Sequence, residues 1–290
     1  MNNEREINAL IQLLDDNDQE IFKHVQTKLI SFGTEVIPSL EEAWSAEINP
    51  VTHERLEEII HRIQFDSLVK EWKLWLSNEP DNLLLGAFLI SKYYYPDIVF
   101  EEVEKKMAKL KQSVWLELNY NQTALEQIQI FNQVFYNYHD FKGDQTPVSF
   151  HDFCLNNVLD FKHGNAVSIG IIYQVLANQL NLPVYGVPLT QHYVLAFCKK
   201  VIFDFQLEKE LDRQVMFYIN PINRGSIFSR NEIKDYLEKM QVNQSPEFFS
   251  PASVEMIIRE MLAYLITLHR NASEFDKADE LTYLRGLFES

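Results

Sequence analysis

Apolar residues recur at helical spacing along most of the chain, and strand-like runs replace this pattern only in the stretch that follows residue 183. Between residues 83 and 95 nearly every position is apolar, which predicts a buried helix. Short runs rich in β-branched and aromatic residues predict strands at 184–187, 193–197, 201–205 and 215–219. The pattern therefore predicts an α+β, helix-dominated protein with one small antiparallel sheet.

The first 65 residues contain four short apolar stripes that polar turns separate. The stripes lie at 7–14, 21–30, 40–44 and 56–63. Each stripe covers one face of a helix, so a helix pair can bury its apolar side chains only against a neighbouring pair. We interpret residues 1–118 as a helical region that begins with a HEAT-like stack.

The segment 162–205 combines a helix with strands. Gly164 breaks the chain, Asn165 is suited to cap a helix start, and apolar residues then follow at helical spacing as far as Leu180. Two strand-like runs come next, and His192 stands at the start of the second. A buried helix start beside a strand-borne histidine is how papain-like and transglutaminase-like folds hold a nucleophile near its base.

The flanks of this segment carry simpler patterns. Residues 139–149 are rich in turn formers and predict a surface loop, and residues 150–159 predict a short helix. At the end of the chain, apolar stripes at 254–265 and 275–288 predict two amphipathic helices. We interpret residues 246–290 as a TPR-like hairpin whose stripe packs on the core.

Composition and charge exclude several functional classes. The net charge of −16 would repel a phosphate backbone or an anionic membrane surface, so neither nucleic acid nor a membrane is an expected partner. The two cysteines, Cys154 and Cys198, suggest neither a disulfide framework nor a metal site, and a reduced cytoplasm is the expected compartment. No nucleotide-binding or metal-ligand motif is present, so we expect no cofactor and no metal.

Three motifs occur in the order seen in the bacterial SirB-type transglutaminase-like proteins, and the chain resembles that family. The motifs are GNAVSIG at 164–170, TQHY at 190–193 and FYINPINRG at 217–225. The resemblance covers roughly residues 120–240. It implies a transglutaminase-like core at 119–245, between the helical region 1–118 and the hairpin 246–290.

The resemblance also implies a site of three parts, namely a cysteine at the helix start, a histidine on the adjacent strand and an orienting Asp or Asn. His192 matches the histidine. Asn220 matches the orienting residue, and Asp204 is a rival for that role. Ala166 stands where catalytic relatives carry the cysteine, and its methyl group cannot attack a carbonyl carbon.

Two other side chains are candidates for a relocated nucleophile. Ser168 lies two residues beyond Ala166, which is about 200° around a helix, so it faces away from His192 if Ala166 faces it. Cys198 shares a strand face with His192, but six residues of strand place it about 20 Å away.

We therefore expect a non-catalytic transglutaminase-like protein that binds a protein or peptide partner, with the partner and the oligomeric state left open. Free amides at the helix start would suit a polar or anionic group. The expected pocket comprises Gly164, Asn165, Ser168, Gln191, His192, Asn220 and Asn223. The alternative is a cysteine- or serine-type amide hydrolase or acyltransferase that uses His192 with Ser168 or Cys198.

Overall fold

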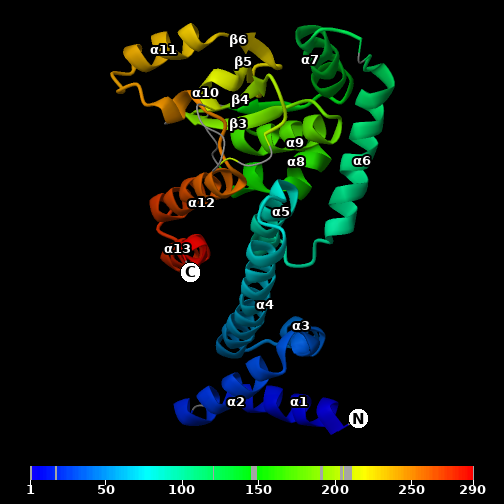
Figure 1. The fold of residues 1–290 in the computed structure, drawn as a ribbon. Helices are drawn as coiled ribbons and strands as arrows, with labels where there is room; N and C mark the ends of the chain where they lie inside the picture. The colour runs from blue at the N-terminus through cyan, green and yellow to red at the C-terminus, as the bar shows by residue number, and fades with distance from the viewer. Residues whose placement is uncertain are drawn as a thin grey trace. The chain divides into compact units, whose positions relative to one another are not determined.

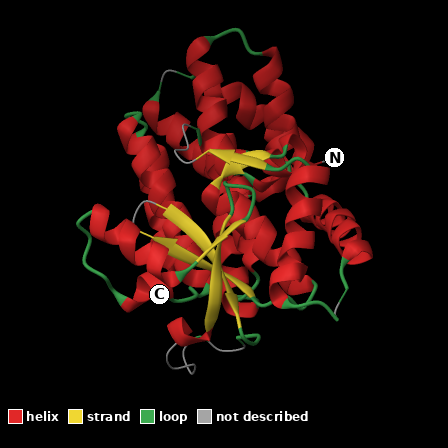
Figure 2. Ribbon diagram, turned by 90° about the horizontal axis from the view of Figure 1, so that it is seen from above, coloured by secondary structure: helices red, strands yellow, loops and turns green. Residues whose placement is uncertain are grey.

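The computed structural model describes residues 2–16, 18–119, 121–144, 149–189, 192–202, 205 and 211–289. The chain divides into two compact units, Met1–Leu74 and Trp75–Ser290. Helices dominate both units, and the strands form two small sheets (Figures 1 and 2). The predicted α+β, helix-dominated class is confirmed. The predicted boundaries after residues 118 and 245 stay predictions.

The first unit is built of helices around one apolar cluster. Its helices are α1 (Asn2–Gln12), α2 (Gln19–Ser31), α3 (Ile37–Ala46) and most of α4 (Pro50–Asn78). The cluster comprises Ile7, Leu14, Val25, Leu29, Val36, Leu40, Leu56, Ile59 and Ile63. Arg55 on α4 donates to the backbone oxygens of Leu14 at 2.6 Å and Asp16 at 2.8 Å. The four predicted stripes are therefore the buried faces of a single core.

The helix α4 is longer than the stripe at 56–63 suggests, because it continues over 29 residues. After Pro50 its sequence contains neither glycine nor proline, so nothing interrupts the hydrogen bonds between successive turns.

The second unit surrounds the sheets with helices. Before the larger sheet come α5 (Leu83–Tyr94), α6 (Phe100–Glu117), α7 (Ala124–Asn132) with a π-helical turn (Gln133–Tyr138), α8 (Leu155–Phe161) and α9 (Ala166–Gln179). The short helix α10 (Leu211–Gln214) lies between the second and third strands of that sheet, and α11 (Arg230–Lys239), α12 (Val254–Asn271) and α13 (Phe275–Gly286) follow it. The buried helix predicted at 83–95 is confirmed as α5, of which nine residues are buried.

The larger sheet has the strand order β3-β4-β5-β6, and every neighbouring pair is antiparallel. The strands are β3 (Val184–Leu189), β4 (His192–Cys198), β5 (Val215–Asn220) and β6 (Ser226–Phe228). The small antiparallel sheet is confirmed. The strand predicted at 201–205 is wrong at its first two residues, because Val201 and Ile202 are described and lie outside any strand. The fourth strand is β6 instead, since the turn after Asn220 folds it back onto β5.

The second sheet is a parallel pair of β1 (Lys142–Asp144) and β2 (His163–Asn165). The loop predicted at 139–149 therefore contains a strand. Its hydrogen-bonding partner lies some twenty residues further along the chain, so the local pattern of turn-forming residues could not reveal it.

The helix α9 packs closely on the larger sheet because two glycines leave room for one aromatic ring. A β-carbon on Gly170 of α9 would lie 2.5 Å from Cε1 of Tyr193, and one on Gly186 of β3 would lie 1.8 Å from its hydroxyl oxygen. Tyr193 is 3% exposed. This packing directs the Tyr193 side chain of β4 toward α9.

The opposite face of the sheet carries a second apolar cluster. Because side chains alternate along a strand, the neighbours of Tyr193 on β4 point to that opposite face. The cluster comprises Tyr185, Val187, Leu189, Val194, Ala196, Cys198, Ile202, Tyr218, Ile233, Leu237 and Phe249. Ile233 and Leu237 belong to α11, so α9 and α11 cover opposite faces of the sheet (Figure 1).

The hairpin of α12 and α13 is joined to the end of α5 by hydrogen bonds. The Tyr94 hydroxyl lies 2.7 Å from His269 Nε2, and the other ring nitrogen lies 2.6 Å from a carboxylate oxygen of Glu274. The Tyr93 hydroxyl donates to Glu280 at 2.7 Å. The apolar stripe of α12 is buried and α12 contacts α5, so the hairpin packs on the core as expected.

The close approach of α9 and β4 predicts that Gly170→Ala destabilises the protein by about 1–3 kcal/mol, because the added methyl group collides with the Tyr193 ring. The matched control is Gly286→Ala at the end of α13, where a β-carbon meets no atom within 4 Å. It should be neutral or stabilise by up to about 1 kcal/mol, since alanine favours helix. Urea unfolding measures both variants, and equal effects would contradict the packing.

Candidate functional site

The start of α9 is capped by the side chains of Asn165 and Ser168. Asn165 caps the helix, because its side-chain oxygen accepts hydrogen bonds from the amides of Val167 at 2.8 Å and Ser168 at 2.9 Å. The predicted cap is therefore confirmed. The expectation that free amides at this helix start would bind a polar or anionic group is not met by these two amides, because the Asn165 side chain already accepts their hydrogen bonds.

Ser168 is fully buried and committed to hydrogen bonds. Its hydroxyl donates to the backbone oxygen of Asp152 at 2.6 Å and accepts from the amide of Asn165 at 3.1 Å. Gly164 leaves room for this arrangement, because a β-carbon there would lie 2.6 Å from the Ser168 oxygen. The geometry gives Ser168 the role of a structural cap and offers no path by which a substrate could reach it.

Ala166 is the first residue of α9 and is partly exposed. It is the position at which the motif resemblance places the nucleophile. Its side chain is more accessible than those of Asn165 and Ser168, which are 2% and 0% exposed. The helix start therefore presents a methyl group where the catalytic thiol of a transglutaminase-like enzyme would stand.

His192 is the first residue of β4, and its side chain lies on the face of the sheet away from α9. It pairs with Leu189, which belongs to the apolar cluster opposite α9, and paired residues share a face. Its ring packs edge-on against Tyr236 of α11, with ring centroids 4.9 Å apart. Burial lowers the pKa of His192, so the neutral ring is favoured at neutral pH. The structure does not bring His192 to the helix start.

Asn220 ends β5 and holds the turn that follows. Its side-chain oxygen accepts from the amides of Ile222 and Asn223, both at 3.1 Å. The last paired residues of this ladder are Leu195 and Ile219, so Asn220 extends the register opposite Val194 rather than His192. The carboxamide is thus engaged in the turn.

The turn after Asn220 is also held by hydrogen bonds from side chains of the preceding helices. Tyr136, on the π-helical turn, donates to the backbone oxygen of Pro221 at 2.8 Å, and Asn132 donates to that of Gly225 at 2.8 Å. Tyr173 of α9 in turn donates to Asn132 at 2.9 Å. The turn that carries Asn220 and Asn223 is therefore anchored to α7 and α9. The remaining predicted residues Gln191 and Asp204 lie outside the described residues.

Both cysteines are buried in apolar surroundings. Burial raises the pKa of the Cys198 thiol to about 12, and burial also raises the pKa of Cys154 well above its usual range. A thiol with so high a pKa is almost wholly protonated at neutral pH and is a poor nucleophile. Cys198 lies at the far end of β4 from His192.

A pocket of about 490 Å³ opens beside His192 at the end of the β3–β4 hairpin. Arg259, Glu260 and Tyr264 of α12 line one side, and Arg285 of α13 lines another. Arg259 is engaged by Glu289 at 2.8 Å and by Glu255 at 3.4 Å. The Nε atom of Arg285 is buried and, among the described residues, has no hydrogen-bond partner.

Sequence reasoning did not find three of the groups that shape the site. The backbone oxygen of Asp152 accepts from Ser168 and Asn165, and a backbone acceptor leaves no trace in residue type. Tyr236 appears in the sequence only as part of an apolar helix face. Arg285 is an isolated basic residue in a tail whose helical stripe gave no sign of a pocket.

Among the described residues, no group of three or more His, Cys, Asp or Glu side chains could hold a metal ion. No helix in the described ranges combines the length and the apolarity needed to cross a membrane.

Comparison with known proteins identifies the family of the core. The model of the transglutaminase-like superfamily matches residues 101–263, which is more than half of the chain. No curated protein and no solved structure gave a significant match. The match includes α9, the whole larger sheet, His192 and Asn220. The chain therefore belongs to the transglutaminase-like superfamily.

Proposed function

We propose that this protein is a non-catalytic member of the transglutaminase-like superfamily that binds a protein or peptide partner. The observation that carries the proposal is Ala166 at the start of α9, where the motif resemblance expects the nucleophilic thiol. A methyl group can form no acyl intermediate, so the chemistry that defines a cysteine-type site has no attacking atom at this position.

The environments of the other candidate nucleophiles support the proposal. The Ser168 hydroxyl is fully buried and bonded on both sides, and the Cys198 thiol has a raised pKa at the far end of β4. His192 could activate a hydroxyl or thiol only within hydrogen-bond reach. Its ring instead packs against Tyr236 on the face away from α9. No observation favours the hydrolase or acyltransferase alternative.

The pocket beside His192 is the place where we propose that the partner binds. The buried Nε of Arg285, which has no hydrogen-bond partner among the described residues, is a donor that requires an acceptor. Glu247 and Glu260 also line the pocket and offset the charges of Arg259 and Arg285, so the Arg285 donor and not a net positive charge would attract the ligand. The chain-terminal carboxylate of a peptide is such an acceptor.

The finer assignments form part of the same proposal. The motifs favour the bacterial SirB-type subfamily, and the acidic chain with two reduced cysteines favours the cytoplasm. The successive helices of Met1–Leu74 favour a HEAT-like arrangement, and the pair α12 and α13 favours a TPR-like hairpin. Both arrangements are common peptide-binding scaffolds, which agrees with a binding function.

An activity assay tests the absence of catalysis. The purified chain should neither hydrolyse a glutamine side-chain amide in a reporter peptide nor attach a fluorescent primary amine to it, and His192→Ala should leave the background unchanged.

Ser168→Ala should lower the free energy of unfolding by about 1–3 kcal/mol, because the Asp152 oxygen and the Asn165 amide lose a buried partner.

The control for Ser168→Ala is Ser113→Ala, whose exposed hydroxyl donates to a helix carbonyl at 3.1 Å and whose loss should change stability by less than about 0.5 kcal/mol. Turnover that disappears in His192→Ala or in Ser168→Ala while the variant remains folded would establish an enzyme and refute the proposal.

A peptide selection tests the binding pocket. Random peptides displayed with free carboxyl ends are selected on the full chain, and the enriched peptides are resynthesised as free acids and as amides. The free acid should bind at least about tenfold more tightly, since a charge-assisted hydrogen bond to Arg285 is worth about 1.5–3 kcal/mol. Arg285→Gln should remove this preference, whereas Arg270→Gln, on an exposed residue outside the pocket, should retain it. Equal binding of acid and amide would contradict the pocket.

A further inference from the structure

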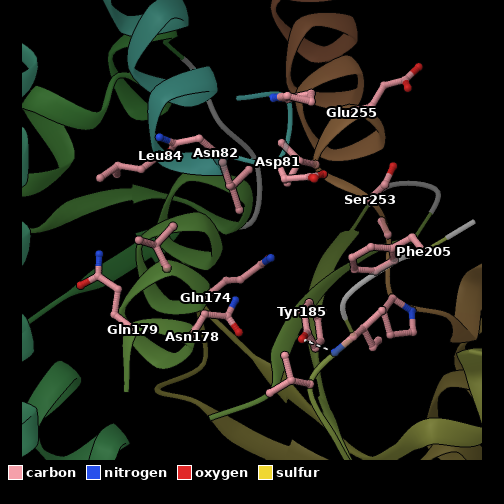
Figure 3. Close-up of a pocket in the computed structure, with 18 of the residues that line it drawn as sticks. Asp81, Asn82, Leu84, Gln174, Asn178, Gln179, Tyr185, Phe205, Ser253 and Glu255 are labelled. Atoms are coloured by element: carbon pink, nitrogen blue, oxygen red, sulfur yellow. Dashed lines mark hydrogen bonds between the residues drawn. The ribbon is translucent and has the colours of Figure 1, made fainter. Parts of the chain in front are cut away.

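A larger pocket lies beside the C-terminal half of α9, wholly within the second unit. Its volume is about 1160 Å³. The walls come from the start of α5, from α6, from the end of α9 and the start of β3, and from the residues that begin α12 (Figure 3). It adjoins the pocket beside His192, because both are lined by Leu211, Pro251, Ala252 and Met256. The two pockets thus offer one extended path along the edge of the sheet.

The size of this pocket favours a stretch of polypeptide. Pockets for compounds of drug size measure roughly 300–1,000 Å³. This pocket exceeds that range at about 1160 Å³, before the adjoining pocket of about 490 Å³ is considered. A small metabolite would leave most of the space filled with water, whereas an extended peptide could occupy both compartments.

One buried polar group in the large pocket has an unused hydrogen-bond donor. Gln174 of α9 is 4% exposed, and its side-chain oxygen accepts from the amide of Gly186 at 2.9 Å. Its amide nitrogen donates to none of the described residues, and Figure 3 shows that this side chain reaches into the space between α9, β3 and α12. A donor in this position suits a backbone carbonyl oxygen of a bound peptide.

The charged groups on the walls all have one sign. Among the described lining residues, the side chains that carry a charge at neutral pH are Asp81, Glu104 and Glu255, and the described lining contains no lysine, arginine or histidine. Glu255 has a partner in Arg259, whereas Asp81 and Glu104 form no ion pair with any described residue. The C-terminal end of α9 adds the partial negative charge of its carbonyl groups. Tyr185 and Phe205, whose ring centroids are 5.6 Å apart, add aromatic surface beside these acids.

We infer that this acidic pocket receives a lysine or arginine side chain of the bound peptide, on the segment that precedes its carboxyl end. The inference rests on the proposed peptide-binding function and adds the position of the peptide body and the charge of its side chain. The Gln174 amide binds a peptide carbonyl, and the carboxylates of Asp81 and Glu104 bind the cation.

The test uses the peptides selected through their carboxyl ends and two matched double variants of the full chain. Asp81→Asn with Glu104→Gln removes two pocket charges. Asp97→Asn with Glu102→Gln removes two exposed charges outside the pocket, so the net charge of the two proteins is the same. All four residues are exposed, and these isosteric changes should leave the fold intact.

The selected peptides should carry lysine or arginine upstream of the carboxyl end. They should bind the pocket variant about fivefold more weakly than the wild type, and the control variant with unchanged affinity, as two partly exposed ion pairs predict. Replacing the basic residue by glutamine in the peptide should weaken binding to the wild type but not to the pocket variant. That result shows that the peptide cation and the pocket acids act on each other.

Two results would overturn the inference. One is that the selected peptides lack basic residues, and the other is that the two double variants bind them with equal affinity. If the preference for a free carboxyl end and its dependence on Arg285 persist in that case, the proposed function stands and only the role of the acidic pocket is refuted. Loss of both dependences refutes the proposed binding site as well.

Discussion

The position of Tyr193 between two glycines decides what the rest of the site can do. Gly170 on α9 and Gly186 on β3 leave a space that only their missing side chains make possible, and the ring of Tyr193 fills it. Alternation along β4 then directs His192 to the opposite face of the sheet, where its ring packs against Tyr236 at the edge of the pocket that α12 lines. One packing contact thus separates the histidine of the second motif, at 190–193, from the helix start of the first motif, at 164–170.

This separation agrees with the chemistry on each side of the sheet. At the helix start, Asn165 and Ser168 satisfy each other and the Asp152 carbonyl, so the polar groups that an enzyme would use for catalysis stabilise the fold instead. His192, in contrast, shares a pocket with Arg285, whose buried Nε donor has no partner in the part of the chain that the structure describes. The ligand-binding potential therefore lies with the histidine, while the helix start has become structural.

The sequence predicted the parts of this arrangement that local chemistry determines. The Asn165 cap, the buried helix α5 and strand β4, predicted at 193–197, all follow from residue types at fixed spacing. Strands β1, β2 and β6 were not predicted, because each depends on a partner strand brought close by a turn or by tertiary packing. The sequence also could not show which face His192 occupies. From Tyr193 onward β4 is buried on both faces, so no alternation of apolar and polar residues marks the side that meets α9.

The separation of His192 from the helix start can be tested through the thiol pKa of the Ala166→Cys variant, which is determined from the dependence of its alkylation rate on pH. We expect the thiol pKa to be the same in the presence of His192 and in a His192→Ala background, because the imidazole lies on the other face of the sheet. A thiol pKa depressed by two or more units that returns to normal in the His192→Ala background would show an ion pair of the papain type. That result would place His192 at the helix start and contradict the account.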